Sequence, residues 1–255
     1  SWSAGGTMIN GGYGYAVANA AAQDAGMIGG LASPYRTCTE EYNGTSWASG
    51  GALNDSRWGL SGAGTQNDSV AFGGNSPSVE EYDGTSWTEA ASLSTGRYGL
   101  TRAGTGRSSA LAVGGASPSL TGATEHYAKQ EVCTATYKCN LGGVWSSGGS
   151  LITARCDLAG AGTQNEALAF GGNGCKTCTE EYDGSSWSAG GAMITARAPY
   201  NGSGQNSTQG AGIVFGGDTP STVACTEEYN GSSWTAGGAL STARYSGGAA
   251  GVQNS

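Results

Sequence analysis

The chain has 255 residues, of which 48 are glycine and only 12% are charged, and its formal net charge is −8. Five of the eleven basic residues share one position of a repeated pattern. No basic stripe therefore remains to neutralise phosphates, and a nucleic-acid partner is not expected. No apolar run approaches the ~18 residues of a membrane helix, so no membrane span is expected either.

The same pattern recurs along the whole chain. Six tryptophans, 40 to 58 residues apart, mark the copies: Trp2, Trp47, Trp87, Trp145, Trp187 and Trp234. A repeat of this length with a double glycine in each copy indicates a repeat architecture. Because repetition spreads residues evenly, whereas catalysis needs an asymmetric cluster, we do not expect an enzyme.

Each copy divides into four short segments with the pattern of β-strands. In one copy, residues 97–104 form the first strand, 105–108 a turn, and 110–113 an apolar second strand that ends in a Gly-Gly pair. Short apolar runs bounded by turn residues are typical of strands buried on both faces. A third strand carries Thr-Glu-Glu-Tyr or a variant of it. Asn-Gly or Asp-Gly then supplies the positive φ of a tight turn before a fourth strand, which carries the Trp.

Four consecutive antiparallel strands in every copy predict the blades of a β-propeller. No helix is expected, and the Ala-rich segment 19–25 is assigned to the hairpin between a first and a second strand. The chain opens with a fourth strand at Trp2 and closes with a first strand after Arg244. We expect an all-β propeller of about six blades, five complete and one partial, as one domain over residues 1–255 of a longer chain. The missing strands would follow Ser255 or come from a partner, and a five-bladed ring is the alternative.

The order of Gly-Gly, a Tyr in the third strand and a Trp five residues later resembles the kelch repeat. This repeat also builds the propeller in the central domain of galactose oxidase. Gly73-Gly74, Tyr82 and Trp87 show it clearly, and the resemblance covers essentially the whole chain. The text Glu-Glu-Tyr-Asn-Gly-Thr-Ser-Trp is also similar to kelch-like repeats of phage structural proteins. The resemblance implies a kelch-type propeller. The copper radical site of galactose oxidase would need several His ligands. The chain has one histidine, His126, so a site of that type is excluded.

The charged residues of the repeat are predicted to be structural. Adjacent strand residues point to opposite faces, so the two Glu side chains of one pair do not converge as an acid and a base. Because one Arg recurs in each copy, we expect one Glu of each pair to bridge to an Arg of the same or a neighbouring blade and to help specify register. The residues given this role are Arg57, Arg97, Arg155, Arg197, Arg244, Glu41, Glu81, Glu181 and Glu228.

The seven cysteines give no metal motif. Cys175 and Cys178 form a single C-x-x-C, without the second pair that zinc needs or the helix N-terminus of a redox site. Cys133 and Cys139 lie in an insertion over residues 128–144, within the third complete blade. A disulfide between these two is one of two open alternatives, and it would imply an oxidising compartment. No metal and no cofactor are expected.

Binding is expected in the loops that depart from the repeat, because propellers bind through loops at the ends of the ring. The candidate contacts are Tyr35, Arg36, Tyr137 and Lys138. The alternative is that these loops differ between copies through neutral sequence drift and bind nothing. The leading hypothesis is a non-enzymatic structural and binding module that lies on a virion surface or outside the cell, such as a part of a tail fibre or another appendage. It would adhere to a glycan or a protein receptor.

Two other functions stay open. One is a purely architectural subunit that assembles with neighbouring subunits by strand exchange. The other is a carbohydrate-active enzyme that uses the acids outside the repeat pattern, Asp24, Asp157 and Glu166.

Overall fold

The computed structural model describes residues 6–11, 16–18, 26–31, 36–104, 106–129, 131–134, 137–140, 143–174, 176–199 and 208–245. Every regular element in these ranges is a β-strand, and none is a helix. The all-β class is therefore confirmed. No helix long and apolar enough to cross a membrane occurs among the residues described.

The strands of the first half form four-stranded antiparallel sheets, each built from consecutive segments. The first sheet contains β1 (Ala16–Ala18), β2 (Gly26–Leu31), β3 (Arg36–Tyr42) and β4 (Trp47–Ser49). The second contains β5 (Leu60–Thr65), β6 (Asp68–Gly73), β7 (Val79–Tyr82) and β8 (Trp87–Ala90). The third contains β9 (Thr101–Ala103), β10 (Ser109–Val113), β11 (Thr124–Ala128) and β14 (Val144–Ser147).

The second half continues the same order. The fourth sheet contains β15 (Ala159–Gly162), β16 (Ala167–Phe170), β17 (Thr179–Tyr182) and β18 (Trp187–Ala189). The fifth has three described strands, β19 (Ile213–Phe215), β22 (Thr226–Tyr229) and β23 (Trp234–Ala236). Two separate hairpins are β12 (Glu131–Thr134) with β13 (Tyr137–Asn140), and β20 (Asp218–Thr219) with β21 (Ser221–Thr222).

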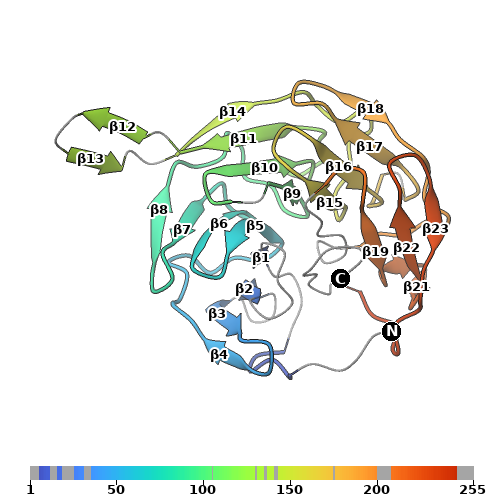
Figure 1. The fold of residues 1–255 in the computed structure, drawn as a ribbon, viewed down its shortest axis with the longest axis horizontal. Coiled ribbons are helices and arrows are strands. Elements are labelled where there is room, and N and C mark those ends of the chain that lie inside the picture. Colours follow the sequence, from blue (N-terminus) through green and yellow to red (C-terminus); the bar gives the residue numbers. More distant parts are fainter. Residues whose placement is uncertain are drawn as a thin grey trace.

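The five sheets follow one another in chain order around a common centre, with the first strand of each innermost and the Trp-bearing strand at the periphery (Figure 1). Contacts join the innermost strands of consecutive sheets, from β1 to β5, from β5 to β9 and from β9 to β15. The β12–β13 hairpin projects outward from the third sheet (Figure 1). The organisation is therefore blade-like, as the repeat predicts.

The turn before each Trp-bearing strand forms because of its first two residues. Gly84 has a φ of 93°, a conformation that favours glycine. The Asp83 carboxylate accepts the backbone N–H groups of Thr85 and Ser86, both at 2.8 Å. This turn aligns Tyr82 opposite Trp87, and the ring centroids of the pair lie 4.8 Å apart. In the third sheet the β12–β13 hairpin replaces the turn, yet Tyr127 still pairs with Trp145.

The Gly-Gly pair that ends the second strand links consecutive sheets at three boundaries, through Gly74, Gly115 and Gly172. Gly73 and Gly74 have φ values of 75° and 93°, and the N–H of Gly74 donates to the carbonyl of Arg97 at 2.9 Å. A Cβ atom on Gly74 would lie 2.8 Å from the carbonyl oxygen of Trp58. Both the backbone conformation and the close approach therefore require glycine here.

The apolar core is divided among the sheet boundaries. One cluster joins Phe72 and Val79 of the second sheet to Leu100 and Tyr127 of the third, and equivalent clusters lie between the third and fourth and between the fourth and fifth sheets. Val70, Ala71 and Phe72 follow one another along β6, so their side chains point to alternate faces, and all three are buried. The second strands are thus packed on both sides, as their short apolar runs predict.

The first strand of the third sheet is shorter than the sequence pattern suggests. The pattern predicts a strand over residues 97–104, but β9 covers only Thr101–Ala103. Gly99 has a φ of 61°, which is incompatible with an extended strand, and Tyr98 forms an isolated bridge with Ala116 instead. The predicted hairpin at residues 19–25 lies outside the described residues.

Candidate functional site

A buried ion pair stabilises each of four sheets. The Arg before the first strand reaches the third strand of its own sheet and binds the first Glu of the Glu-Glu pair or, in the third sheet, the single Glu. The Nη2 atom of Arg57 lies 2.8 Å from Glu80, and Nη1 of Arg155 lies 2.8 Å from Glu180. The other pairs are Arg97 with Glu125 and Arg197 with Glu227, and no side chain in the four pairs is more than 5% exposed.

Burial lowers the pKa of Arg57 and Arg155, and the facing carboxylates oppose that effect. Because each pair lies inside its own sheet and is repeated from sheet to sheet, the four pairs do not form a shared reactive centre. These arginines hold the loop that leads into each first strand against the third strand.

Arg244 has the backbone position of the other repeat arginines but a different side-chain environment. Its carbonyl accepts the N–H of Gly217 at 2.9 Å, as the carbonyl of Arg97 accepts that of Gly74. Its side chain is exposed, and Nε donates to the carbonyl of Thr242 at 3.4 Å. Among the described residues, no carboxylate forms an ion pair with it.

The second Glu of the motif connects one sheet to the next. The hydroxyl of Tyr82 donates to Glu41 at 2.7 Å, and that of Tyr127 donates to Glu81 at 2.7 Å. The hydroxyl of Tyr229 donates to Glu181 at 2.6 Å. Glu228 occupies the matching position of β22. Glu41, Glu81 and Glu181 thus lie at sheet boundaries, and their partners there are tyrosines rather than the repeat arginines.

His126 takes the place of this Glu between the third and fourth sheets. Its Nε2 atom lies 2.8 Å from the hydroxyl of Tyr182, and a neutral imidazole can accept that proton. Burial lowers the pKa of His126 below its usual value.

The pKa of a histidine is about 6.5 in the unfolded chain, and that of His126 is lower in the folded protein. His126 therefore contributes its full stability above about pH 6.5, and this contribution is lost as the pH falls through the folded-state pKa. We therefore expect the free energy of unfolding to fall more steeply between pH 7 and pH 5 in the wild type than in His126→Gln, whose amide oxygen can still accept the Tyr182 proton. Urea denaturation at both pH values measures the difference. Equal slopes for the two proteins would contradict this role of His126.

A second kind of sheet-to-sheet bond joins the Trp indole to the Thr that opens Thr-Glu-Glu-Tyr in the preceding sheet. The indole Nε1 atoms of Trp87, Trp187 and Trp234 donate to the hydroxyls of Thr39, Thr124 and Thr179 at 3.1, 3.1 and 2.9 Å. This Thr is not among the residues predicted from the sequence to have a role. Its recurrence one residue before the Glu-Glu pair was the signal that could have identified it.

Two positions leave this bond unmade among the described residues. The second sheet has Val79 in place of the Thr, and the buried Nε1 of Trp145 has no hydrogen-bond partner. In the fifth sheet the Thr is present, but the buried hydroxyl of Thr226 has no partner.

The predicted ligand contacts lie on different sheets. Arg36 begins β3 and pairs with Leu31 in the first sheet, whereas Tyr137 and Lys138 lie in β13. Figure 1 shows β3 and the β12–β13 hairpin well separated, so the structure does not bring Arg36 to the hairpin. Tyr35 lies outside the described residues. The side chains of the other three are not described, and their binding role stays a prediction.

The cysteines lie partly in the β12–β13 hairpin and partly in the repeated sheets. In the β12–β13 hairpin Cys133 pairs with Lys138 and Cys139 pairs with Val132. The side chains of the two cysteines are not described, so the disulfide between them stays a prediction. Cys178 is disulfide-bonded, whereas Cys156 and Cys225 are not in a disulfide.

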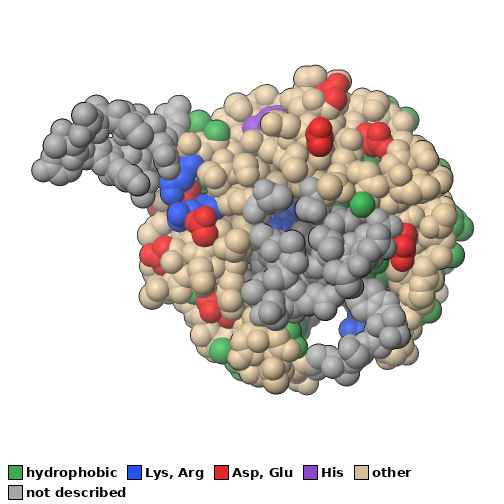
Figure 2. Space-filling model, in the orientation of Figure 1, with side chains coloured by type: hydrophobic (Ala, Val, Ile, Leu, Met, Phe, Trp, Pro, Cys, Tyr) green, Lys and Arg blue, Asp and Glu red, His purple; other side chains and the backbone are tan. Residues whose placement is uncertain are grey.

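Charged side chains gather where the β12–β13 hairpin leaves the third sheet. Arg107 lies 2.5 Å from Asp68 and 3.4 Å from Glu81, and Lys129 lies 3.5 Å from Glu81. Figure 2 shows basic and acidic side chains grouped on this side of the molecule. We call Asp68, Glu81, Arg107 and Lys129 the Glu81 cluster. It ties the base of the hairpin to the second sheet.

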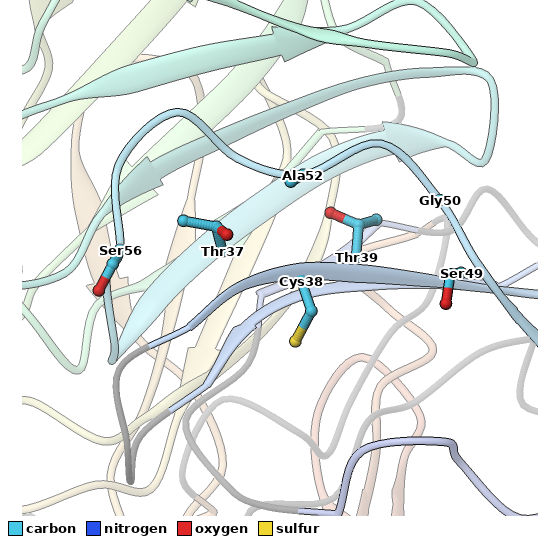
Figure 3. Close-up of a pocket in the computed structure, with 7 residues that line it drawn as sticks. All are labelled: Thr37, Cys38, Thr39, Ser49, Gly50, Ala52 and Ser56. Atoms are coloured by element: carbon cyan, nitrogen blue, oxygen red, sulfur yellow. The ribbon is translucent and has the colours of Figure 1, made fainter.

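One groove runs beside β3 and has a volume of about 500 Å³. Thr37, Cys38 and Thr39 line one side, and the segment from Ser49 to Ser56 lines the other. Figure 3 shows the Cys38 thiol pointing away from the Thr39 hydroxyl, as expected for consecutive strand residues. The backbone bond from Gly50 to Thr39 recurs between the matching residues of other sheets, so this groove follows from the repeat and does not distinguish one sheet from another.

A more polar pocket of about 570 Å³ lies between the fourth and fifth sheets. Three carboxylates line it, from Glu166, Glu181 and Asp183, and Gln209 of the fifth sheet completes the wall. The pKa of Asp183 is held well below its usual value by hydrogen bonds from the backbone and side chains of Ser185 and Ser186. This pocket combines acidic groups with space for a ligand.

Of the acids outside the repeat pattern, the described Asp157 and Glu166 lie at opposite ends of β15. Asp157 lies before β15, within hydrogen-bond distance of Cys156 and Asn173, and burial raises its pKa. Glu166 lies beyond the far end of β15, in the polar pocket. Asp24 lies outside the described residues. No group of three or more His, Cys, Asp or Glu side chains in the described part of the chain is placed to hold a metal ion.

No model of a known protein family matches this chain, and no curated protein matches it either.

Proposed function

We propose that the chain is a kelch-type β-propeller that acts as a non-enzymatic binding module, outside the cell or on a virion surface. The observation that carries the proposal is the β12–β13 hairpin. It is the one described segment that replaces a repeat turn with a projecting arm, and the Glu81 cluster holds its base. The candidate partner is a glycan or a protein receptor.

Contacts of residues 6–10 support a closed ring. The N–H of Gly6 donates to the Tyr42 hydroxyl at 3.4 Å, and the N–H of Ile9 donates to Glu40 at 2.9 Å. One sheet later, Gly51 donates to the Tyr82 hydroxyl at 3.1 Å and Asn54 donates to Glu80 at 2.7 Å. Residues 6–10 therefore contact the first sheet in the same way as the segment after β4 contacts the second sheet. They fit the segment that follows the outer strand of a sixth blade.

The proposed ring has a specific closing contact. Trp2 precedes Gly6 by four residues, as Trp47 precedes Gly51. In three sheets the matching indole bonds to the Thr of the preceding sheet. For a six-bladed ring the preceding sheet is the fifth, whose Thr226 has a buried hydroxyl without a described partner. The proposal therefore predicts a bond from the Trp2 indole to Thr226, and Trp2 itself lies outside the described residues.

Replacing the hairpin tests the binding proposal. Residues 128–144 are exchanged for Asp-Gly-Ser-Ser, the turn that joins Tyr182 to Trp187 in the fourth sheet. We expect thermal stability to stay within a few degrees, because the Tyr127–Trp145 pairing is kept. We expect binding to a glycan array or to host-surface receptor proteins to be lost. Unchanged binding by the exchanged protein, or no binding by the wild type, would contradict the proposal.

A second candidate is an architectural subunit that accepts strands from a neighbour. The observation that favours it is the fifth sheet, where Arg244 is exposed and Thr226 lacks a described partner. Sedimentation velocity separates the candidates, because strand exchange predicts concentration-dependent oligomers. A monomer at all concentrations would favour the closed binding module.

A further inference from the structure

We infer that the chain binds a quaternary ammonium group at the aromatic ring of Tyr98 and the carboxylate of Asp157, where the innermost strands of the third and fourth sheets begin. Trp58 lies beside Tyr98, and the centroids of their rings are 5.1 Å apart. The innermost strands surround the centre of the molecule, whereas the β12–β13 hairpin projects from its periphery (Figure 1). The inference therefore does not depend on what the hairpin binds.

The aromatic pair is a local feature and not part of the repeat. Trp58 and Tyr98 directly follow the repeat arginines of the second and third sheets. In the fourth and fifth sheets the same position holds Cys156 and Ala198, which are both buried. Trp58 and Tyr98 are only half-buried, and they lie outside the apolar clusters of the described sheets. The fold thus accepts small side chains at this position, and the two rings are not needed to fill the core.

The row of aromatic rings ends at the fourth sheet. Trp58 is the only ring that contacts Tyr98 within the described chain, because the next sheet has Cys156 where another ring would stand. The face of an aromatic ring carries partial negative charge and attracts cations. Tyr98 therefore offers a half-buried ring to a cationic ligand on the side of the fourth sheet.

Asp157 brings a carboxylate to the same place. Its N–H donates to the carbonyl of Gly99 at 2.7 Å, and a Cβ atom on Gly99 would lie 2.6 Å from its Oδ1. Oδ2 accepts hydrogen bonds from the Cys156 thiol at 3.2 Å and from the Asn173 amide at 2.8 Å. Oδ1 accepts none among the described residues. One carboxylate oxygen is thus fixed by the protein, and the other is left for a ligand next to the residue that follows Tyr98.

This carboxylate has no cationic partner in the protein. None of the described Lys or Arg side chains forms an ion pair with Asp157. Burial raises its pKa, and only the hydrogen bonds from Cys156 and Asn173 oppose that effect. Because a partly buried charge without a countercharge is unfavourable, a bound cation would stabilise the site.

The backbone at Asp157 indicates that folding alone does not select this residue. Its φ is 55°, and the matching residues of the second and third sheets are Gly59 and Gly99, with φ values of 65° and 61°. Glycine adopts this conformation without strain, whereas aspartate does so at a cost in free energy. Strain of this kind is concentrated at ligand-binding sites. The carboxylate itself is therefore the reason that we give for an aspartate at a glycine position.

A quaternary ammonium matches both parts of the site. Its methyl groups pack against an aromatic face while its charge is attracted to the ring and to the carboxylate. A primary ammonium is compact and strongly hydrated, so it loses more hydration on leaving water. A neutral ligand would leave the charge of Asp157 without a partner.

The test measures the binding of choline to the chain by isothermal titration calorimetry. We expect saturable binding. The neutral isostere 3,3-dimethyl-1-butanol keeps the shape of choline but lacks its charge, so it should bind at least about ten-fold more weakly. N-acetyl-trimethyllysine amide carries the same group on a protein side chain, and the tighter of the two ammonium ligands identifies the source of the group.

Three variants locate the site. Tyr98→Ala introduces the residue that the fifth sheet has at this position, so the fold should persist while choline binding weakens at least about five-fold. Asp157→Asn keeps a residue type that tolerates a positive φ, and it should weaken binding by a similar factor. Glu89→Gln removes the same charge from an exposed position of β8 and should leave binding unchanged.

Three results would overturn the inference. They are equal binding of choline and its neutral isostere, no saturable binding of either ammonium ligand, and full binding of choline to Tyr98→Ala or Asp157→Asn.

Discussion

Replacing Arg155 by methionine is expected to lower the free energy of unfolding by about 3–5 kcal/mol, because it leaves the carboxylate of Glu180 buried without its cation. The Arg155 side chain is fully buried, and its Nη2 also donates to the carbonyl of Ala169 at 3.1 Å. Glu180 keeps only the backbone N–H groups of Ile152 and Thr153 as described partners. Urea denaturation monitored by tryptophan fluorescence measures the loss.

The chain contains a matched control for this variant. Arg244 has the same repeat position, but its side chain is exposed and has no described carboxylate partner. Arg244→Met should therefore change stability by less than about 0.5 kcal/mol, as surface substitutions usually do. A double variant, Arg155→Met with Glu180→Gln, should recover part of the loss because the unpaired charge is removed. Equal losses for Arg155→Met and Arg244→Met would show that the ion pair does not stabilise the sheet.

The Thr–Trp bonds predict changes of opposite sign in the free energy of unfolding for substitutions at two equivalent positions, 179 and 79. Thr179→Val removes the acceptor of the Trp234 indole, and we expect it to cost about 1–3 kcal/mol, since a buried donor is left unsatisfied. Val79→Thr does the reverse, because it offers a hydroxyl to the unsatisfied Nε1 of Trp145. It should be neutral or stabilise by up to about 1 kcal/mol, as the new bond offsets the buried methyl group that is lost.

Both variants exchange the same two side chains at the same repeat position, so they control for each other. Thermal and urea denaturation of the pair would measure the signs. If both substitutions destabilised the protein equally, the indole bond would not be the reason that Thr recurs at this position.

The sequence predicts the elements of each sheet because the signals are local. The Asn-Gly and Asp-Gly turns, the Gly-Gly pairs and the apolar second strands each act within a few residues, and all appear where expected. The order of strands within a sheet follows from short connections. The insertion at 128–144 could also be placed between a third and a fourth strand from the sequence alone.

The partners of the polar side chains could not be predicted in the same way. The repeat shows that a Glu-Glu pair and an Arg recur, but it does not show which Glu faces inward. The structure assigns the first Glu to the Arg of its own sheet and the second to the Tyr of the next sheet, because adjacent residues on β7 or β17 point to opposite faces.

Closure of the ring through Trp2 and Thr226 is the central claim, and a double-mutant cycle tests it most directly. Trp2→Phe removes the indole N–H, Thr226→Val removes the hydroxyl, and the double variant completes the cycle. The account predicts that each single variant destabilises the chain and that the two effects are coupled by about 1 kcal/mol or more. If the effects were additive and Thr226→Val were stabilising, the buried hydroxyl would have no indole partner, and the proposed closure would be wrong.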